Sequence, residues 1–307
     1  MNPPLVDVLP AWNLQSARIA QDLTAGGSPE RVRGRYVLEH CGRRFVLECL
    51  SLAKRQARQR EATILQTMQN HGCPHLCPWL ATADGQAGIA ADGYFWQLRA
   101  WKPTHDLDRD AYGHDAWRGQ VMAEFLRNMR EASHGLTDDE QPFLLCEYIP
   151  VLMRLIHDGN HRLYDDLSPI IAELQEILAL EPSLPRAFCH GDFHPLNVLW
   201  GEQSLNAVID WEFCGLKPQL YDIANLLGCL GMDSPQFLTS PMAAAILHGT
   251  ADFADPELLP PYIAAQRLAW MREWFVKKDR EMMVQELDFL WLLLDNRDLL
   301  ARRFREL

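Results

Sequence analysis

The segments His190-Gly-Asp-Phe-His-Pro-Leu-Asn197 and Ile209-Asp-Trp-Glu212 carry the most informative polar pattern in this chain. Asp192 and Asn197 are five residues apart, and Asp210 follows later, directly after an apolar stretch. Phosphoryl transfer needs a carboxylate that orients or deprotonates the acceptor hydroxyl, and oxygen ligands that hold Mg²⁺ on the phosphates. This ordered trio therefore predicts a phosphoryl-transfer site.

The residues alone also permit a metal site or a purely structural role. His190, Asp192 and His194 alternate as His-x-Asp-x-His, which on a strand would place three metal ligands of a hydrolase on one face. Pro195 directly after them favours a loop instead, and a zinc site would leave the rest of the pattern without a role. The structural role would be that of polar residues in turns and helix caps.

Composition and charge are those of a soluble globular enzyme. The chain has 307 residues, of which 48% are hydrophobic and 23% charged, and this length suggests two domains or one large one. A net charge of −12 argues against a nucleic-acid partner and suits cationic substrates. The absence of a basic signal region and of a long apolar run predicts a cytoplasmic protein without a membrane partner.

Eight scattered cysteines fit reduced thiols, although Cys73 and Cys77 could begin a zinc site.

The first third of the chain predicts a small sheet around one helix. Strands are expected at residues 35–40 and 44–49, with Cys41-Gly42 as the hairpin turn, and at residues 78–82 and 94–100. Residues 54–70 have apolar positions at helical spacing and predict the helix.

Beyond Lys102-Pro103 the pattern is mainly helical. Helices are expected at residues 112–133, 146–157, 161–180 and over much of 221–305, with short strands at 187–190 and 206–209. The sequence therefore predicts an α+β fold of two lobes. Residues 1–101 would form a β-rich, nucleotide-binding lobe, and residues 102–307 a helical lobe with the catalytic and substrate-binding groups, with the nucleotide clamped between the lobes.

The same segments resemble a known family. His190 to Leu199 and Ile209 to Glu212 are similar to the signature of the aminoglycoside phosphotransferase and choline kinase family, whose fold is protein-kinase-like. Pro218 to Ala224 resembles the segment that usually comes next in this family. The specific match covers roughly residues 186–230, while lobe order and length agree over nearly the whole chain.

The resemblance implies a role for each matching residue. Asp192 would be the catalytic base, and Asn197 and Asp210 would coordinate Mg²⁺ on the phosphates of ATP. His190 would brace the loop, and Asp222 would stabilise the loop or cap its helix.

Nucleotide contacts are expected in the N-terminal lobe. Gly26, Gly27 and Ser28 precede the first strand pair, where a flexible backbone could approach phosphates, although a plain turn fits nearly as well. Arg99 and Trp101 belong to the connection between the lobes, whose backbone would offer donors and acceptors to an adenine edge.

Glu48 departs from the family pattern. By strand order it aligns with the position where the family usually carries Lys or Arg on the phosphates. Glu61 lies where kinases place the acid that pairs with this strand cation, and a solvated helix-face glutamate is the alternative. Two acids there would repel each other and ATP, so Arg44, Lys54 and Arg58 become possible substitutes for the missing cation.

The acceptor side is less readable. Trp270, Glu273 and Trp274 share one helical face and could hold a cationic amine, although core packing explains the same stripe more simply. Glu212 is a metal contact, a substrate contact or a solvated acid; the sequence leaves all three open.

These features together predict an ATP- and Mg²⁺-dependent kinase that phosphorylates a hydroxyl of a small molecule. An amino alcohol, an aminoglycoside-like amino-sugar, a homoserine-like compound or a sugar would fit, and the oligomeric state is left open. A stress-type protein Ser/Thr kinase is one alternative. A regulatory, nucleotide-binding pseudokinase is the other, motivated by Glu48 and opposed by the intact trio of Asp192, Asn197 and Asp210.

Overall fold

The computed structural model describes residues 5–27, 31–136 and 142–307. Contacts within the chain group it into two compact units, each assembled from three separate stretches. The first unit comprises Met1–Leu107, Glu131–Leu136 and Leu196–Phe213, and the second comprises Asp108–Arg130, Thr137–Pro195 and Cys214–Leu307. The backbone therefore passes between the units five times.

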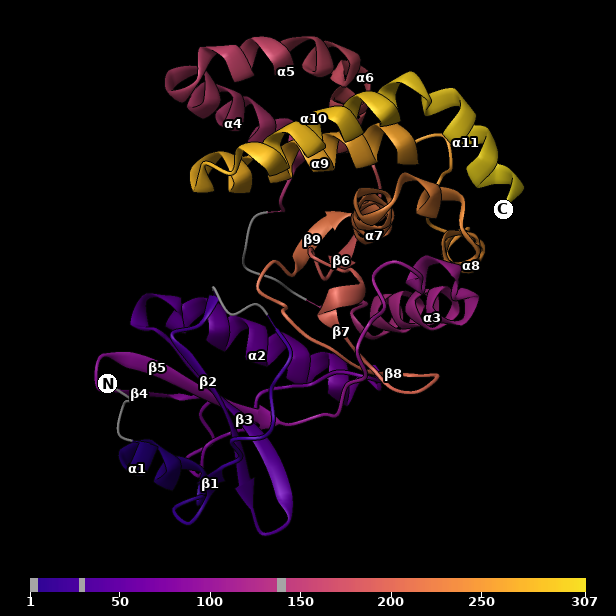
Figure 1. The fold of residues 1–307 in the computed structure, drawn as a ribbon. Helices are drawn as coiled ribbons and strands as arrows, with labels where there is room; N and C mark the ends of the chain where they lie inside the picture. Colours follow the sequence, from indigo (N-terminus) through magenta and orange to yellow (C-terminus); the bar gives the residue numbers. More distant parts are fainter. Residues whose placement is uncertain (1–4, 28–30, 137–141) are drawn as a thin grey trace. The chain divides into compact units, whose positions relative to one another are not determined.

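A five-stranded antiparallel sheet is the frame of the first unit (Figure 1). In spatial order its strands are β1 (Arg18–Ile19), β2 (Gly34–His40), β3 (Arg43–Ser51), β5 (Tyr94–Ala100) and β4 (Ile89–Ala91). Cys41 and Gly42 connect β2 to β3 with positive φ angles of 49° and 74°, the conformation that suits a two-residue hairpin. This turn fixes the register in which Arg35 lies opposite Glu48.

The two faces of this sheet have different neighbours. Phe45, Leu47 and Cys49 of β3 pack in an apolar cluster with Leu9 and Trp12, which belong to the short helix η1 (Leu9–Trp12) after α1 (Leu5–Val8). Successive strand residues point to opposite faces, so Glu48 points away from this cluster. It lines a pocket with residues of α2 (Arg55–Asn70), the helix that follows η3 (Leu52–Lys54).

A small hairpin completes the first unit. Strands β7 (Val198–Trp200) and β8 (Leu205–Val208) pair antiparallel, and Leu199, Ala207 and Ile209 form a buried cluster with Cys77. The Val208 N–H also donates to the His75 carbonyl at 2.9 Å. The hairpin is thereby fastened to the loop that follows α2, although more than 100 residues separate them in the chain.

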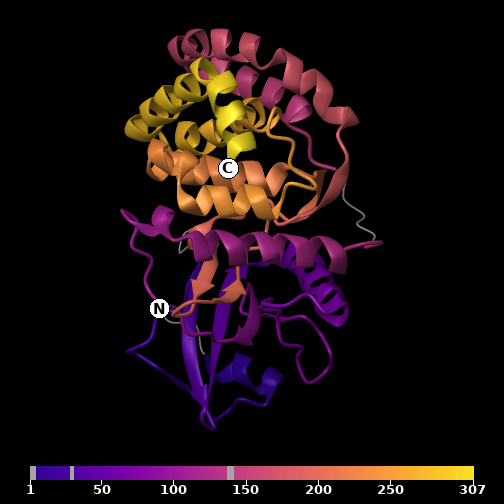
Figure 2. The same cartoon turned by 90° about the vertical axis from the view of Figure 1, so that its right-hand side faces the viewer.

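Helices make up most of the second unit (Figure 2). The α-helices of this part of the chain are α3 (Ala116–Ala132), α4 (Leu145–Gly159), α5 (His161–Glu173), α6 (Gln175–Leu180), α7 (Tyr221–Asp233), α8 (Pro241–Gly249), α9 (Leu259–Lys277), α10 (Arg280–Asp295) and α11 (Arg297–Glu306). Short 3-10 turns are η4 (Tyr112–His114), η5 (Glu181–Ser183), η6 (Pro195–Asn197) and η7 (Pro235–Thr239), and β6 (Arg186–Cys189) pairs with β9 (Gly215–Pro218). Helices α9 and α10 lie side by side, and α7, which is almost wholly buried, packs against α9 (Figures 1 and 2).

Side-chain caps determine where several of these helices begin. Asn160, Ser240 and Asp279 precede α5, α8 and α10, and each accepts a backbone N–H of the first turn. Helix α4 is capped from outside its own segment, because the buried Glu181 accepts the N–H groups of Leu145 and Cys146 at 3.0 and 2.7 Å. These caps satisfy donors that the helix itself leaves unpaired.

The α+β class expected from the sequence is confirmed, with a sheet in the N-terminal part and helices in the C-terminal part. The strand expected at residues 78–82 is wrong, since Trp79 forms only one isolated bridge to Arg99. The helix expected at 161–180 is divided at Leu174. Strands β1, β4, β7 and β9 were not expected, because two to four residues are too few for alternation to be visible. Within the described ranges, no helix combines the length and apolar character needed to cross a membrane.

Candidate active site

Asp192 lies on a tightly braced loop of the second unit. The loop follows β6, and the N–H groups of His190 and Gly191 donate to the two carboxylate oxygens of Asp222 at 2.7 and 2.8 Å. Gly191 has a φ of 86°, which residues with a side chain rarely adopt. The Asp192 N–H in turn donates to His190 Nδ1 at 3.2 Å. The first turn of α7, through Asp222, therefore fixes the path of the backbone into Asp192.

Burial makes this brace sensitive to protonation. It raises the pKa of Asp222 to about 6, against the opposing effect of the two N–H donors and of Lys217. The nearby Asp192 carboxylate adds to the rise. Asp222 is therefore ionised, and a full double acceptor, only above about pH 6.

The neighbours of Asp192 hold the next residue as well. Asn225 Nδ2 donates to the Phe193 carbonyl at 3.1 Å, and the Phe193 ring stacks on Phe125 with centroids 5.5 Å apart. His194 Nε2 lies 3.5 Å from Asp192 Oδ1. The Asp192 side chain is itself only 7% exposed, so it points from a loop with little freedom. Asn225 was missed by the sequence reasoning, because nothing in its local pattern distinguishes it from a helix-packing residue.

Asn197 and Asp210 flank the open end of the β7–β8 hairpin in the first unit. Val198 pairs with Val208, and the Ile209 N–H donates to the Asn197 carbonyl at 3.0 Å. Asp210 has a φ of 64°, a left-handed conformation that costs a non-glycine residue about 1–2 kcal/mol. Strain of this kind persists where the surroundings over-determine it, and it is common at functional sites. The side chains of Asn197 and Asp210, an amide and a carboxylate, carry the kinds of oxygen ligand that Mg²⁺ accepts together with phosphate oxygens.

The alternative metal sites find no support. Over residues 5–27, 31–136 and 142–307, no three or more His, Cys, Asp or Glu side chains are grouped to hold a metal ion. His190 Nδ1 accepts a backbone N–H instead of facing a metal site. Cys73 and Cys77 are buried free thiols, and burial raises the pKa of Cys73 to about 12.

The glycine loop is held against the first unit by side chains. The Gly26 carbonyl accepts Arg99 Nη2 at 3.2 Å, and the Gly27 carbonyl accepts Arg35 Nη1 at 2.7 Å. A Cβ at Gly26 would lie 2.7 Å from Leu199 Cδ2, so a larger residue here would have to displace the Leu199 side chain. Ser28, the third residue of the expected loop, lies outside the described residues.

Glu48 is neutralised by two arginines. Its carboxylate accepts Arg35 Nε at 2.8 Å and lies 3.8 Å from Arg99 Nη2, and the residue is only 3% exposed. Arg35 and Arg99 are the same residues that hold the glycine-loop carbonyls. Glu48 therefore supports the glycine loop indirectly, because it pairs with the two arginines that hold the loop. Their positive charges, on β2 and β5, offset the repulsion expected from an acid at this strand position.

Glu61 forms an ion pair with an arginine of its own helix, α2, instead of with a cation on the strand β3. Arg58 Nη1 donates to it at 2.7 Å and Trp79 Nε1 at 2.9 Å. Burial raises the pKa of Glu61, with Arg58 acting in the opposite direction. Neither partner was expected from the sequence, and the alternative of a solvated glutamate is wrong, because Glu61 is buried.

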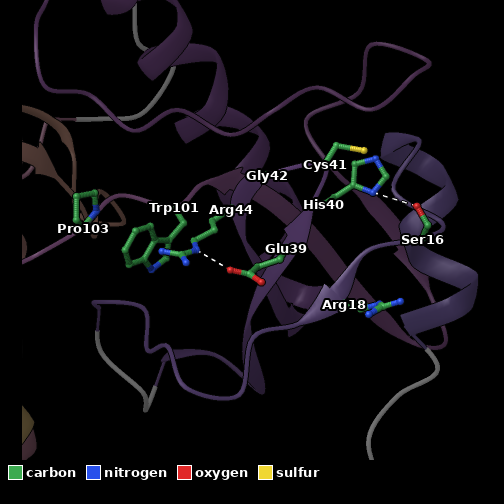
Figure 3. Close-up of a pocket in the computed structure, with 9 residues that line it drawn as sticks. All are labelled: Ser16, Arg18, Glu39, His40, Cys41, Gly42, Arg44, Trp101 and Pro103. Atoms are coloured by element: carbon green, nitrogen blue, oxygen red, sulfur yellow. Dashed lines mark hydrogen bonds and ion pairs between the residues drawn. The ribbon is translucent and has the colours of Figure 1, made fainter.

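Arg44 is engaged by Glu39 and Trp101 (Figure 3). It pairs with Glu39 at 2.7 Å and lies over the Trp101 ring, 5.4 Å from the centroid, on the wall of an open pocket at the β2–β3 turn. The Trp101 N–H donates to the Arg44 carbonyl at 3.0 Å, and its ring nitrogen to the Thr24 carbonyl at 3.1 Å. Of the three possible substitutes for the strand cation, Lys54 and Arg58 therefore remain.

The tryptophans of α9 contact groups that the sequence did not indicate. Trp270 Nε1 donates to Asn225 Oδ1 at 3.3 Å, which connects α9 to the residue that holds the Phe193 carbonyl. Trp274 Nε1 donates at 3.0 Å to Glu286, a wholly buried acid. Glu273 instead pairs with Lys277 at 3.1 Å on the surface of the same helix.

Comparison with known proteins agrees with this fold. The class of the protein is that of phosphotransferases with a protein-kinase-like fold. Residues 23–262 match the phosphotransferase enzyme family, APH, and the chain belongs to this family. No curated protein matches the chain.

Solved structures of several antibiotic-modifying enzymes are similar to it. An aminoglycoside phosphotransferase from Alicyclobacillus acidocaldarius has 16% identity and a TM-score of 0.66, covering 100% of this chain and 97% of its own. A thermostable variant of the aminoglycoside phosphotransferase APH(4)-Ia, in a ternary complex with AMP-PNP and hygromycin B, has 17% identity and a TM-score of 0.68, covering 95% and 96%. Amicoumacin kinase in complex with AMP-PNP and Ca²⁺ has 14% identity and a TM-score of 0.63, covering 89% and 91%. At these identities the likeness establishes the fold.

Proposed function

We propose that this phosphotransferase moves the γ-phosphoryl group of ATP, with Mg²⁺, to a hydroxyl of a small molecule. The observation that carries the proposal is Asp192 on a loop whose backbone is fixed by Asp222, followed five residues later by Asn197 at the mouth of the β7–β8 hairpin. Complexes of two relatives with AMP-PNP support the choice of nucleotide.

Each residue has a definite task in this reaction. The Asp192 carboxylate accepts the proton of the acceptor hydroxyl as the acceptor oxygen bonds to the γ-phosphorus, and the bond from that phosphorus to the bridging oxygen breaks to release ADP. The side-chain oxygens of Asn197 and Asp210 hold Mg²⁺, whose charge neutralises the phosphate oxygens. His190 and Asp222 position the loop that carries Asp192.

The acceptor is a small molecule with a hydroxyl group, of the amino-alcohol, aminoglycoside-like, homoserine-like or sugar class. One similar structure is in complex with hygromycin B, and another is that of a spectinomycin phosphotransferase, which supports a small-molecule acceptor. Trp270 of α9 is the candidate substrate contact, because it shares Asn225 with the loop of Asp192.

The test is an acceptor library assayed for ADP release with the whole chain. We expect Asp192→Asn to lower kcat at least a thousandfold for any accepted compound, because the proton acceptor is lost, while Mg²⁺–ATP still raises the melting temperature. Asp210→Asn should abolish this thermal shift.

The exposed Asp288→Asn is the matched control and should behave as wild type. Undiminished turnover in Asp192→Asn would contradict the role of Asp192 as the proton acceptor. Phosphorylation of a protein substrate alone would favour the Ser/Thr kinase alternative, and nucleotide binding without any turnover would favour the pseudokinase.

A further inference from the structure

Three basic side chains of the first unit converge on one carboxylate. Glu212 is paired with Arg31 through Nη1, with Lys54 Nζ at 3.2 Å and with Arg58 Nη2 at 3.8 Å. Arg31, Lys54 and Arg58 are called the three-cation cluster below. Lys54 and Arg58 are four residues apart in η3 and α2, and the tertiary fold brings Arg31, which precedes β2, and Glu212, which follows β8, to them.

This cluster differs from an ordinary surface ion pair. Arg58 is 4% exposed, and Glu61 fixes its guanidinium from the other side at 2.7 Å. Taking a cation out of water is costly, so a buried arginine that is oriented by one acid and directed towards a second anion is a built feature. Planar guanidinium groups together with a lysine ammonium are the donors that phosphate oxygens accept best.

The other arginines of this region are already engaged. Arg35 and Arg99 hold Glu48 and the carbonyls of Gly27 and Gly26. Arg58 lines one pocket together with Asp210, the proposed Mg²⁺ ligand of the same unit. Cations and a metal ligand side by side are what a polyphosphate chain with its Mg²⁺ requires.

We propose that the three-cation cluster binds the phosphates of the nucleotide, replacing the strand cation whose position Glu48 occupies. Glu212 holds the cluster together when no nucleotide is bound, and a phosphate group displaces its carboxylate. This assignment rests on the proposed function and names the residues that bind the phosphoryl donor. It also gives Glu212 a role apart from the three alternatives that the sequence left open.

The test measures binding of Mg²⁺-free inorganic tripolyphosphate by calorimetry, because this probe has neither an adenine nor a metal ion. We expect Lys54→Met and Arg58→Met each to weaken binding about tenfold or more, which is about 1.4 kcal/mol per factor of ten. Arg58→Lys should recover part of the loss. Glu212→Gln should tighten binding several-fold, because the competing carboxylate loses its charge.

The exposed Arg55→Met, on the same helix as Arg58, is the matched control and should change the affinity less than twofold. Arg58→Met leaves the buried Glu61 without its arginine partner, so circular dichroism checks that this variant is folded. Lys54 is half-exposed, and Lys54→Met is therefore the variant that should fold normally. Wild-type affinity in both Lys54→Met and a folded Arg58→Met, or no binding of tripolyphosphate by the wild type, would contradict the proposal that the three-cation cluster binds phosphate. Weaker binding of tripolyphosphate by Glu212→Gln would contradict the proposal that phosphate displaces the Glu212 carboxylate.

The two proposals fail separately. If Asp192→Asn abolishes turnover while the cluster variants keep their affinity for ATP and tripolyphosphate, the kinase function stands and the cluster is refuted. If tripolyphosphate binds through the cluster and no acceptor is phosphorylated, the anion site stands and the function is refuted.

Discussion

Glu48 lies on β3 between Arg35 of β2 and Arg99 of β5, and its effect depends on both neighbours. The pairing with Arg35 follows from the two-residue turn at Cys41-Gly42, so it could be predicted from the sequence. The approach of Arg99 to Glu48 could not be predicted, because it depends on which strand pairs with the other edge of β3. A charge in a sequence is therefore interpretable only once its cross-strand partners are known.

At the scale of single residues, the raised pKa of Asp222 predicts how the stability of the protein changes with pH. Its folded-state pKa of about 6 lies above the value of 3.8 for an unperturbed aspartate, so the native state holds the proton more tightly than the unfolded chain. The stability that this group contributes is complete below about pH 4 and is lost as the pH rises through about 6. We expect urea unfolding from pH 4 to 7 to show wild type losing stability relative to Asp222→Asn over this interval.

Asp288→Asn, in an exposed position, should keep the wild-type pH dependence and serves as the control. Parallel pH profiles of Asp222→Asn and wild type would show that the Asp222 carboxyl is not perturbed.

At the scale of elements, the start of α4 depends on a residue far from it in the chain. Glu181 accepts two N–H groups of the first turn of α4 and the Tyr262 hydroxyl of α9 at 2.9 Å. Helix α4 itself was expected from its apolar spacing, with its start within one residue of the observed one. Its cap was not expected, because a capping residue is normally sought next to the helix.

Glu181→Ala should therefore destabilise the protein by about 3 kcal/mol, because hydrogen bonds from buried donors to a charged acceptor are lost together. Chemical denaturation monitored by circular dichroism measures the change. Glu176→Ala, an exposed acid in the neighbouring helix α6, should cost less than about 0.5 kcal/mol. Equal effects of the two substitutions would contradict the capping role.

At the scale of the whole molecule, neither compact unit is a continuous piece of chain. The first unit takes the β7–β8 hairpin from residues 196–213, and the hairpin supplies Leu199, Ala207 and Ile209 to the cluster around Cys77. A fragment that ends before the hairpin keeps the five-stranded sheet and loses these buried partners. The exposed apolar surface would then favour aggregation over folding.

We expect residues 1–107, expressed alone, to lack a cooperative thermal transition and a dispersed amide spectrum in NMR. Restoring residues 196–213 through a flexible linker should recover part of both. A sharp transition in the short fragment would show that the hairpin is dispensable for the first unit.

The sequence by itself determined the α+β class, the main helices, the β2–β3 hairpin and the candidate residues Asp192, Asn197 and Asp210. These follow from short-range information: apolar period, turn chemistry, and the spacing of polar groups on one loop. Only the tertiary structure decided the approach of Arg99 to Glu48, the link from Trp270 to the Asp192 loop, and the convergence of Arg31, Lys54 and Arg58 on Glu212. Each of these joins elements distant in the chain, and the energy of a buried charge depends on the partners that folding brings to it.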